Sequence, residues 1–313
     1  MPTRTPILVT GSHRSGSTWV GHMLALAPGV GYIHEPFSVV HRPGICRASF
    51  DRWFEFVYEG NEASYMDAIR DCLAFRYQPA AELSSVTSVR DLARMARDYW
   101  SFASHRLFRR RPLMKDPFAL CSAEWLGRRF EMDVVILTRH PAAFVGSIKS
   151  KSWNHPFEHF LEQPQLMERY LAEFHDEIRE YARLRYATVD QGILLWNLIH
   201  HVILQLRAVH PEWLFKRHED LSARPIEEFS DVYERLGLEF SRGVRRGIER
   251  STGLEAGTGD VHPLRRHSRS NIWSWRNRLS AAEVERVREG TRDIAEQFYG
   301  EEDWIGPTGV GDP

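Results

Sequence analysis

The sequence has few cysteines. Only Cys46, Cys72 and Cys121 occur among its 313 residues, they lie far apart, and no two form a C-x-x-C pair. We therefore expect neither a disulfide framework nor a cysteine-based zinc site. Because unpaired thiols suit a reducing compartment, we expect a cytoplasmic protein.

Long hydrophobic runs and an excess of either charge are also missing. No stretch reaches the about 18 consecutive apolar residues that a membrane span needs, and the N-terminus has no long apolar segment typical of a signal peptide. The most apolar helical segment, residues 192–209, contains Asn197 and Arg207, which favours a core helix. The formal net charge of −1 gives no reason to expect a nucleic-acid or membrane partner.

Short apolar runs alternate with helical patterns along the chain. This alternation predicts a three-layer α/β fold of the P-loop-like type, in which helices flank a central parallel sheet. We expect residues 1–313 to form a single domain, with a flexible tail at 306–313. Strands are expected at 7–9, 32–34, 113–114, 134–137 and 213–216. Helices are expected from 17, over 119–130, after 141, over 158–184, 191–209, 226–236 and 281–299, and over most of 47–108 with a break at 78–85.

The first expected strand runs into a glycine-containing loop that lacks a lysine. Residues 11–18, GSHRSGST, match the phosphate-loop pattern G-x-x-x-x-G-K-[ST] except that Ser17 stands in the lysine position. A strand, a loop and a helix start in this order point backbone N–H groups and the helix dipole at one anion. The alternative for this loop alone is that Gly11 and Gly16 merely make a tight turn.

The missing lysine bears on which group is transferred. A nucleotide triphosphatase uses that lysine together with a metal-binding acid at another strand end, but the strand at 134–137 ends in Thr138 and Arg139. The loop instead carries Arg14. Because a sulfuryl group in transfer carries less negative charge than a phosphoryl group, fixed cations and amides can replace a metal clamp. The pattern favours metal-independent chemistry.

A second anion site is indicated after the strand at 134–137. Arg139 stands at the carboxyl end of that strand and Ser147 lies in the helix that follows. Ligands of open parallel sheets bind at this end of the strands, and an arginine with a hydroxyl can hold one phosphate. A solvated arginine on a loop is the alternative for this motif alone, but both motifs in this order are much harder to obtain by chance.

Together the two motifs resemble those of sulfotransferases that use 3′-phosphoadenosine 5′-phosphosulfate (PAPS) and release adenosine 3′,5′-bisphosphate. The segment RSGSTW at 14–19 is similar to their 5′-phosphosulfate loop, and Arg139 with Ser147 is similar to their 3′-phosphate site. The resemblance implies that Trp19 lies near the adenine, although a tryptophan at this spacing could equally be core. It implies that the 5′-phosphosulfate is held by Arg14 and by the backbone of Ser15, Gly16, Ser17 and Thr18.

The resemblance extends toward the C-terminus. Residues 216–221, KRHEDL, are similar to the family's YEDL segment, with His218 in place of the tyrosine. A basic stretch follows at 265–269, and Arg265 and Arg266 are the candidates for closing over the 3′-phosphate.

Sulfuryl transfer to a hydroxyl needs a general base and a cation at the leaving oxygen. The KDP segment after the third expected strand resembles that of tyrosylprotein and some carbohydrate sulfotransferases, which usually place a glutamate base after the first helix. The resemblance implies that Glu35 is the base and that Lys115 stabilises the leaving oxygen, with help from Arg14. Asp116 is the second choice for the base and His34 the third.

The expected acceptor is the hydroxyl of a small molecule or glycan: a carbohydrate, a glycolipid or a small metabolite. Residues 47–111 and 151–184 are expected to shape its cleft, and the sequence carries no signal for an oligomeric state. Two other functions stay open at this point. One is a small-molecule kinase or other P-loop nucleotide hydrolase, which would need ATP and magnesium. The other is a non-catalytic protein that binds adenosine 3′,5′-bisphosphate.

Overall fold

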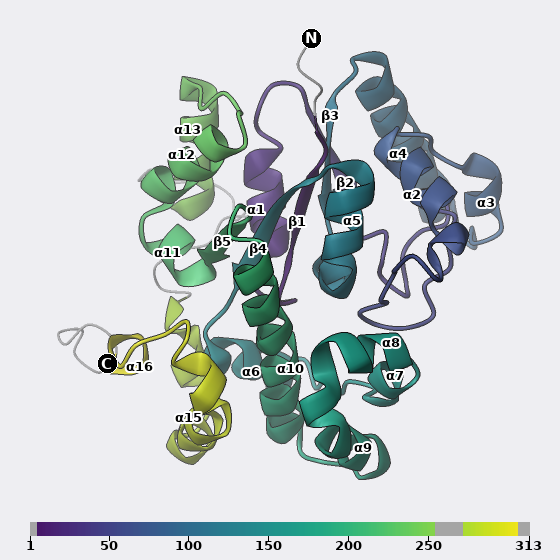
Figure 1. Cartoon of the computed structure of the whole chain (residues 1–313). Coiled ribbons are helices and arrows are strands. Elements are labelled where there is room, and N and C mark those ends of the chain that lie inside the picture. The colour runs from purple at the N-terminus through teal and green to yellow at the C-terminus, as the bar shows by residue number, and fades with distance from the viewer. Residues whose placement is uncertain (1–4, 254–271, 306–313) are drawn as a thin grey trace.

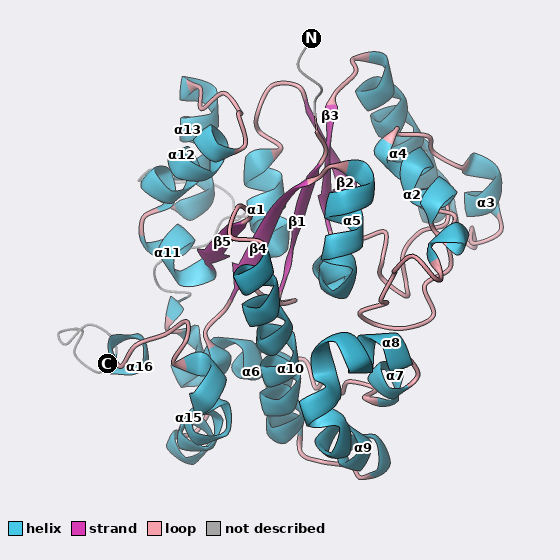
Figure 2. Ribbon diagram, viewed as in Figure 1, coloured by secondary structure: helices cyan, strands magenta, loops and turns pink. Residues whose placement is uncertain are grey.

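A computed structural model of the chain describes residues 5–253 and 272–305. Within these residues, five parallel strands form one sheet in the order β2-β3-β1-β4-β5 (Figures 1 and 2). The strands are β1 (Ile7–Gly11), β2 (Val30–His34), β3 (Arg111–Lys115), β4 (Asp133–Thr138) and β5 (Leu214–Arg217). The predicted α/β class and the five predicted strands are confirmed. β1 to β4 are each a little longer than predicted, and β5 is shifted by one residue.

Helices cover both faces of this sheet, so its central strand is buried on both sides. Ile7 and Val9 point to the face covered by α1 (Ser17–Leu24), α12 (Pro225–Arg235) and α13 (Arg242–Thr252). Leu8 points to the opposite core, to which α5 (Ala123–Phe130) and α10 (Thr188–Val209) contribute. Successive strand residues face opposite sides, so a strand covered on both faces has a continuous apolar run in its sequence.

The remaining helices of the described residues are α2 (Met66–Leu73), α3 (Pro79–Leu83), α4 (Val89–Leu107), α6 (Pro141–Lys149), α7 (Glu158–Leu161), α8 (Pro164–Leu166), α9 (His175–Arg183), α11 (His218–Ala223), α15 (Ala281–Ala295) and α16 (Glu302–Ile305).

The long helix α10 packs against α6 and α15, as Figure 1 shows below the sheet. By length and composition it is the one helix in the described part of the chain that could cross a membrane, but 56% of its most apolar window is buried inside the fold. Trp196, His200 and Ile203 are among its fully buried side chains. This packing is the behaviour of a core helix, as the polar residues in its sequence predict.

The segment before α2 is irregular, so the prediction of helix over most of 47–108 is wrong there. Its backbone N–H groups bond to distant side chains instead of to a helical ladder: Trp53 N–H to His159 at 3.1 Å, Phe56 N–H to Gln163 at 2.8 Å and Val57 N–H to Ser122 at 2.8 Å. Phe54 lies in this segment with φ of +59°, outside the helical region. The helices begin only with a short 3₁₀ turn at Glu62–Ser64 and α2.

The single helix predicted over 158–184 is also wrong. Pro164 interrupts it after α7, because proline lacks an N–H donor and forces the preceding residue out of the helical region. Gln163 accordingly has φ of −121° and ψ of +75°. A π-helical turn at Met167–Leu171 and a 3₁₀ turn at Ala172–Phe174 follow before α9 begins.

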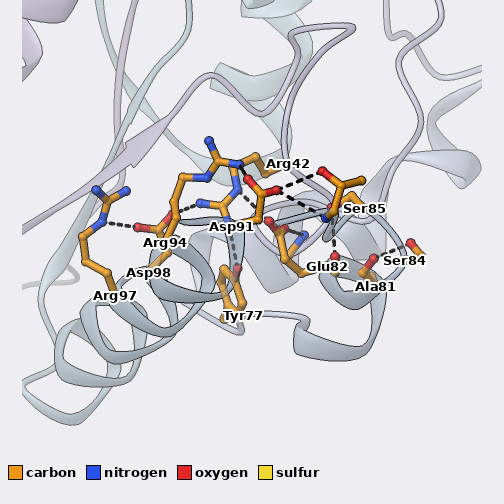
Figure 3. Close-up of polar contacts among 12 residues, drawn as sticks. Arg42, Tyr77, Ala81, Glu82, Ser84, Ser85, Asp91, Arg94, Arg97 and Asp98 are labelled. Atoms are coloured by element: carbon orange, nitrogen blue, oxygen red, sulfur yellow. Dashed lines mark hydrogen bonds and ion pairs between the residues drawn. The ribbon is translucent and has the colours of Figure 1, made fainter. Parts of the chain in front are cut away.

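An arginine-centred polar network ties the loop after β2 to α3 and α4 (Figure 3). Arg42 Nε donates to Glu82 Oε1 at 2.6 Å, and the same guanidinium pairs with Asp98 and donates to Tyr77 Oη at 3.3 Å. Glu82 Oε2 also accepts the Gly44 N–H at 2.7 Å. The chain that leaves Glu35 is therefore anchored a few residues later to a separate helical layer.

Candidate functional site

The candidate site lies at the carboxyl ends of the strands. β1 lies between β3 and β4, so the connections on its two sides diverge and leave a crevice there, the usual ligand position in open parallel sheets. Every strand brings one relevant residue to this edge: Gly11 from β1, Glu35 after β2, Lys115 from β3, Arg139 after β4 and His218 after β5.

The loop from Gly11 to Gly16 has a shape that only glycine allows at its ends. Gly11 has φ of +123°, and a Cβ there would overlap the backbone of Leu137 in β4. Gly16 has φ of +83° at the N-cap of α1, and a Cβ there would lie 2.6 Å from His218 Nδ1. The Ser12 N–H donates to the Leu137 carbonyl at 2.9 Å and fixes the loop on β4. The glycines therefore hold the start of α1 open toward the crevice.

Arg14 brings the two predicted anion motifs together. Its Nε donates to Ser147 Oγ at 2.9 Å, and Arg139 donates to its carbonyl oxygen. Its guanidinium carbon also lies 5.3 Å from the ring centre of Trp153. Arg14 has φ of +65°, a left-handed conformation that turns its side chain out of the loop and onto α6. The predicted 5′-phosphosulfate and 3′-phosphate residues are neighbours in the fold.

Lys115 and Glu35 form an ion pair at the adjoining strand ends. Lys115 Nζ donates to Glu35 Oε1, and the Glu35 N–H donates to the Lys115 carbonyl at 2.9 Å. The Lys115 side chain is 0% exposed and that of Glu35 is 25% exposed, so the carboxylate is the member of the pair that reaches solvent. Glu35 has φ of +43°, a conformation that costs a non-glycine residue about 1 kcal/mol or more and is found at functional sites.

Asp116, the second choice for the base, is fully buried and already engaged. Its two oxygens accept the Phe37 N–H at 2.5 Å and the Phe118 N–H at 2.9 Å, so it caps a 3₁₀ turn at Pro117–Ser122. Burial, together with the nearby Glu35 carboxylate, raises the pKa of Asp116 to about 7. The buried Asp116 carboxyl therefore holds together the segments that follow β2 and β3.

His34, the third choice, lies at the outer side of Glu35. Its Nε2 is 3.9 Å from Glu35 Oε2, and its Nδ1 shares a 3.1 Å hydrogen bond with Tyr32 Oη. Burial and the nearby Lys115 ammonium lower the pKa of His34, which favours the neutral ring.

A cavity of about 280 Å³ opens between these residues. Lys115 and Ser147 do not line it, but each is hydrogen-bonded to a side chain that does. Two guanidinium groups and a helix N-terminus in its lining favour an anionic ligand, and the lining also holds a carboxylate able to accept a proton. The lining includes Arg14, Gly16, Ser17, Thr18, Trp19, Glu35 and Arg139.

Trp19 and His218 flank the phosphate loop as packed aromatic residues. Trp19 is 9% exposed, meets Phe229 edge-on at 5.2 Å between ring centres, and donates from Nε1 to Ser251 Oγ at 3.2 Å. Trp19 lines the cavity, but its burial and its contact with Phe229 make it largely a core residue. His218 is buried against Gly16 and 6.0 Å from the Trp19 ring centre, which places it beside the loop. Arg265 and Arg266 lie outside the described residues.

Four further residues line this cavity that were not predicted as catalytic or donor-binding residues: His13, Pro117, Phe118 and Trp153. Trp153 lies in the range 151–184 that was expected to shape the acceptor cleft. His13 is a loop residue whose neighbours Arg14 to Thr18 carried the motif, and its ring lies among Phe54, Phe118 and Phe144. Burial and the adjacent Arg14 lower its pKa to about 3, so the ring is neutral. Its proximity to Arg14 in sequence was the one available signal.

Comparison with known proteins agrees with this arrangement. A model described as the sulfotransferase family matches residues 6–242, a stretch that contains the phosphate loop, Glu35, Lys115 and Arg139. No curated protein matches the sequence. Similar solved structures include the sulfotransferase domain from the curacin biosynthetic pathway (17% identity, 94% of this chain and 98% of that chain, TM-score 0.47). Another is the sulfotransferase domain of the Synechococcus PCC 7002 olefin synthase (17% identity, 95% of this chain and 96% of that chain, TM-score 0.46). A third is mouse sulfotransferase SULT7A1 complexed with PAP (11% identity, 94% of this chain and 87% of that chain, TM-score 0.40). On the family match and the site geometry, the chain belongs to the sulfotransferase family.

Proposed function

We propose that this sulfotransferase moves the sulfuryl group of PAPS onto the hydroxyl of a small-molecule or glycan acceptor, with Glu35 as general base. The observation that carries the proposal is the Lys115–Glu35 pair, whose carboxylate faces the same cavity as Gly16, Thr18 and Arg139. A base, a buried ammonium and an anion-binding helix start are the groups that this transfer requires.

The donor is held by the phosphate loop and by α6 on this proposal. The first N–H groups of α1 and the Arg14 guanidinium bind the 5′-phosphosulfate, and Arg139 with Ser147 binds the 3′-phosphate. Because Arg14 Nε is bonded to Ser147 Oγ in the protein alone, donor binding exchanges that bond for contacts to the two anions.

The chemical step follows from the Lys115–Glu35 pair. Glu35 accepts the proton of the acceptor hydroxyl while its oxygen forms the new bond to sulfur. Lys115 donates to the oxygen that leaves with the nucleotide, as the bond from sulfur to that oxygen breaks. The products are the sulfate ester, adenosine 3′,5′-bisphosphate and a protonated Glu35 that returns its proton to water.

Geometry favours Glu35 over the other two groups as the base. Both Asp116 oxygens accept backbone N–H groups and Asp116 does not line the cavity, whereas Glu35 does. His34 does not line the cavity and lies 3.9 Å beyond Glu35. Orientation toward the reacting hydroxyl is the first requirement of a general base.

Ligand-induced thermal stabilisation tests the donor. Adenosine 3′,5′-bisphosphate at about 100 times its Kd should stabilise the protein by about 2.7 kcal/mol, a shift of several degrees in Tm. ATP with magnesium should give a much smaller shift. Ser147→Ala and Arg139→Ala should reduce the bisphosphate shift, while Arg128→Ala, on the exposed face of α5, should keep it.

The opposite pattern identifies the competing functions. Stabilisation by ATP with magnesium and none by the bisphosphate would favour the kinase or nucleotide hydrolase. Bisphosphate binding without any transfer from labelled PAPS, over a broad acceptor panel, would favour the non-catalytic binding protein.

A further inference from the structure

A second cavity adjoins the donor cavity. It measures about 230 Å³ and shares three lining residues with its neighbour: His13, Phe118 and Trp153. The Trp153 ring also lies against Arg14, the residue assigned to the phosphosulfate. A molecule in the second cavity therefore lies directly beside the donor site, with these three side chains bordering both cavities.

The walls of this second cavity are mainly apolar and aromatic. The Trp53 and Phe118 rings pack with centres 4.4 Å apart, and those of Phe54 and Phe118 with centres 5.5 Å apart. Among the described residues, none of its lining side chains is an aspartate, glutamate, lysine or arginine, whereas Arg14, Glu35 and Arg139 line the donor cavity. The apolar lining is completed by Ile148, Pro156 and Leu195.

Four polar side chains lie within these apolar walls: the neutral histidines His13 and His155, and the amides of Asn154 and Gln191. The Gln191 amide is already engaged, since it accepts the backbone N–H of His155 at 3.2 Å and donates to the Tyr186 carbonyl at 2.8 Å. His13 is 7% exposed, and its Nδ1 is buried without a hydrogen-bond partner in the described part of the chain. His155 Nε2 is likewise buried and has no hydrogen-bond partner among the described residues. Burial lowers the pKa of both rings. Arg14 adds to the effect on the pKa of His13, and His13 adds to the effect on the pKa of His155. A neutral imidazole can donate or accept one hydrogen bond without requiring a counter-ion.

This lining selects strongly between acceptor classes. A sugar buried here would leave several hydroxyls without partners, and each unpaired buried polar group is costly. An anionic acceptor would meet no cation on these walls. An alcohol with an apolar body buries that body against the rings and needs one hydrogen bond for its hydroxyl.

We propose that the second cavity holds the acceptor, that the acceptor is an uncharged alcohol or phenol with an apolar body, and that His13 hydrogen-bonds its hydroxyl. This inference rests on the proposed function and narrows its acceptor from glycans and metabolites in general to one chemical class. The hydroxyl oxygen bonds to the sulfur of PAPS, the bond from sulfur to the phosphate oxygen breaks, and Glu35 takes the proton.

The test uses the full chain, labelled PAPS and two sets of acceptors. The apolar set is 2-naphthol, benzyl alcohol and 1-hexanol, and the polar set is methyl glucoside and N-acetylglucosamine. We expect sulfate-ester formation from at least one apolar acceptor, with kcat/KM about 100-fold or more above that for either sugar.

Variants then assign the cavity. Trp53 lines the second cavity and not the donor cavity, so Trp53→Ala should raise KM for the apolar acceptor about 10-fold or more and leave kcat within about 3-fold. Trp100→Ala removes a tryptophan that is 70% exposed on α4 and should change neither constant. His13→Phe should lower kcat/KM, and His13→Gln, which keeps a hydrogen-bonding group, should recover part of the loss.

The failures of the two proposals can be distinguished. Stabilisation by adenosine 3′,5′-bisphosphate is measured on every variant and should be the same for wild type and Trp53→Ala. Because His13 also lines the donor cavity, the same measurement on its two variants separates a loss of donor binding from a loss of acceptor binding. If the bisphosphate binds but no apolar acceptor is sulfated, or the sugars react better, the acceptor inference is overturned and the donor assignment stands. If the bisphosphate does not bind the wild type, the proposed function itself fails.

Discussion

At the scale of single residues, the Glu35 carboxylate carries the proposed chemistry. General bases contribute roughly 10²–10⁴-fold to rate, so Glu35→Gln should lower kcat by about that factor. The amide oxygen of Gln can still accept from Lys115 Nζ, so the fold and the affinity for adenosine 3′,5′-bisphosphate should change little. Initial rates with labelled PAPS and thermal shifts with the bisphosphate measure the two effects separately.

Asp116→Asn is the competing variant for this experiment. Asn can accept only one of the two N–H groups that Asp116 binds, so the variant should lose stability first and activity second. A normal kcat in Glu35→Gln, together with a folded but inactive Asp116→Asn, would transfer the role of base to Asp116.

Gly16 and Gly237 form a matched pair for testing the phosphate loop. Both have positive φ, +83° and +62°, but a Cβ at Gly16 would meet His218 Nδ1 at 2.6 Å whereas a Cβ at Gly237 has nothing within 4 Å. Gly237→Ala should therefore lose about 1–2 kcal/mol of unfolding free energy from the left-handed backbone alone. Gly16→Ala should lose more and also weaken bisphosphate binding, and adding His218→Ala should restore part of both. Equal losses for the two single variants in denaturant titrations would exclude the clash.

At the scale of elements, the Arg42 network joins the loop after β2 to α3 and α4 (Figure 3). Arg42→Met leaves the buried Glu82 carboxylate without its cation and should cost roughly 2–4 kcal/mol in urea unfolding. Combining it with Glu82→Gln should cost less than Arg42→Met alone, because no unpaired buried charge then remains. Arg97→Met, an exposed neighbour that also pairs with Asp98, is the control and should stay within about 0.5 kcal/mol. A loss in the control as large as that in Arg42→Met would show that the network adds nothing specific.

The elements that the sequence predicts correctly are those set by local pattern. The apolar run at Ile7–Gly11 and the polar interruptions of α10 lie within the elements themselves. The irregular segment near Trp53 is different, because its backbone is satisfied by His159, Gln163 and Ser122, which lie 65 to 107 positions away. A local sequence pattern cannot indicate hydrogen bonds to residues so far away in the chain, so the spacing of the aromatic residues in this segment resembles that of a helix.

The same distinction applies to the site. Motif spacing was enough to single out Arg14, Arg139 and Ser147 in advance, and the fold brings them together. The lining of the proposed acceptor cavity was predictable only in part. Trp53, Phe54 and the segment at 153–156 fall in the ranges expected to shape the cleft, whereas the phosphate loop, Phe118, Ile148 and α10 add walls from other parts of the chain. The role proposed for His13 depends on the aromatic rings that surround it, and these rings come together only when the chain folds.

At the scale of the whole molecule, stability should depend on the ionisation of Asp116. Its pKa is raised to about 7 in the folded protein, mainly by burial, against about 3.9 in an unfolded chain. Between these values the native state holds a proton that the unfolded state has released, so its stabilising contribution is complete below about pH 4 and is lost as pH rises through about 7. The unfolding free energy of the wild type should fall relative to that of Asp116→Asn between about pH 4.5 and about pH 7.5. A difference between the two proteins that stays constant with pH would contradict the raised pKa.

The aromatic residues that line both cavities also bear on competition from water. Water is itself a hydroxyl nucleophile, and a base beside an activated sulfuryl group would hydrolyse the donor if solvent reached it freely. On the proposed function, the rings of His13, Phe118 and Trp153 border that approach, which favours a nucleophile that replaces water on apolar surfaces. The same packing that selects an apolar acceptor would then conserve the donor while no acceptor is bound.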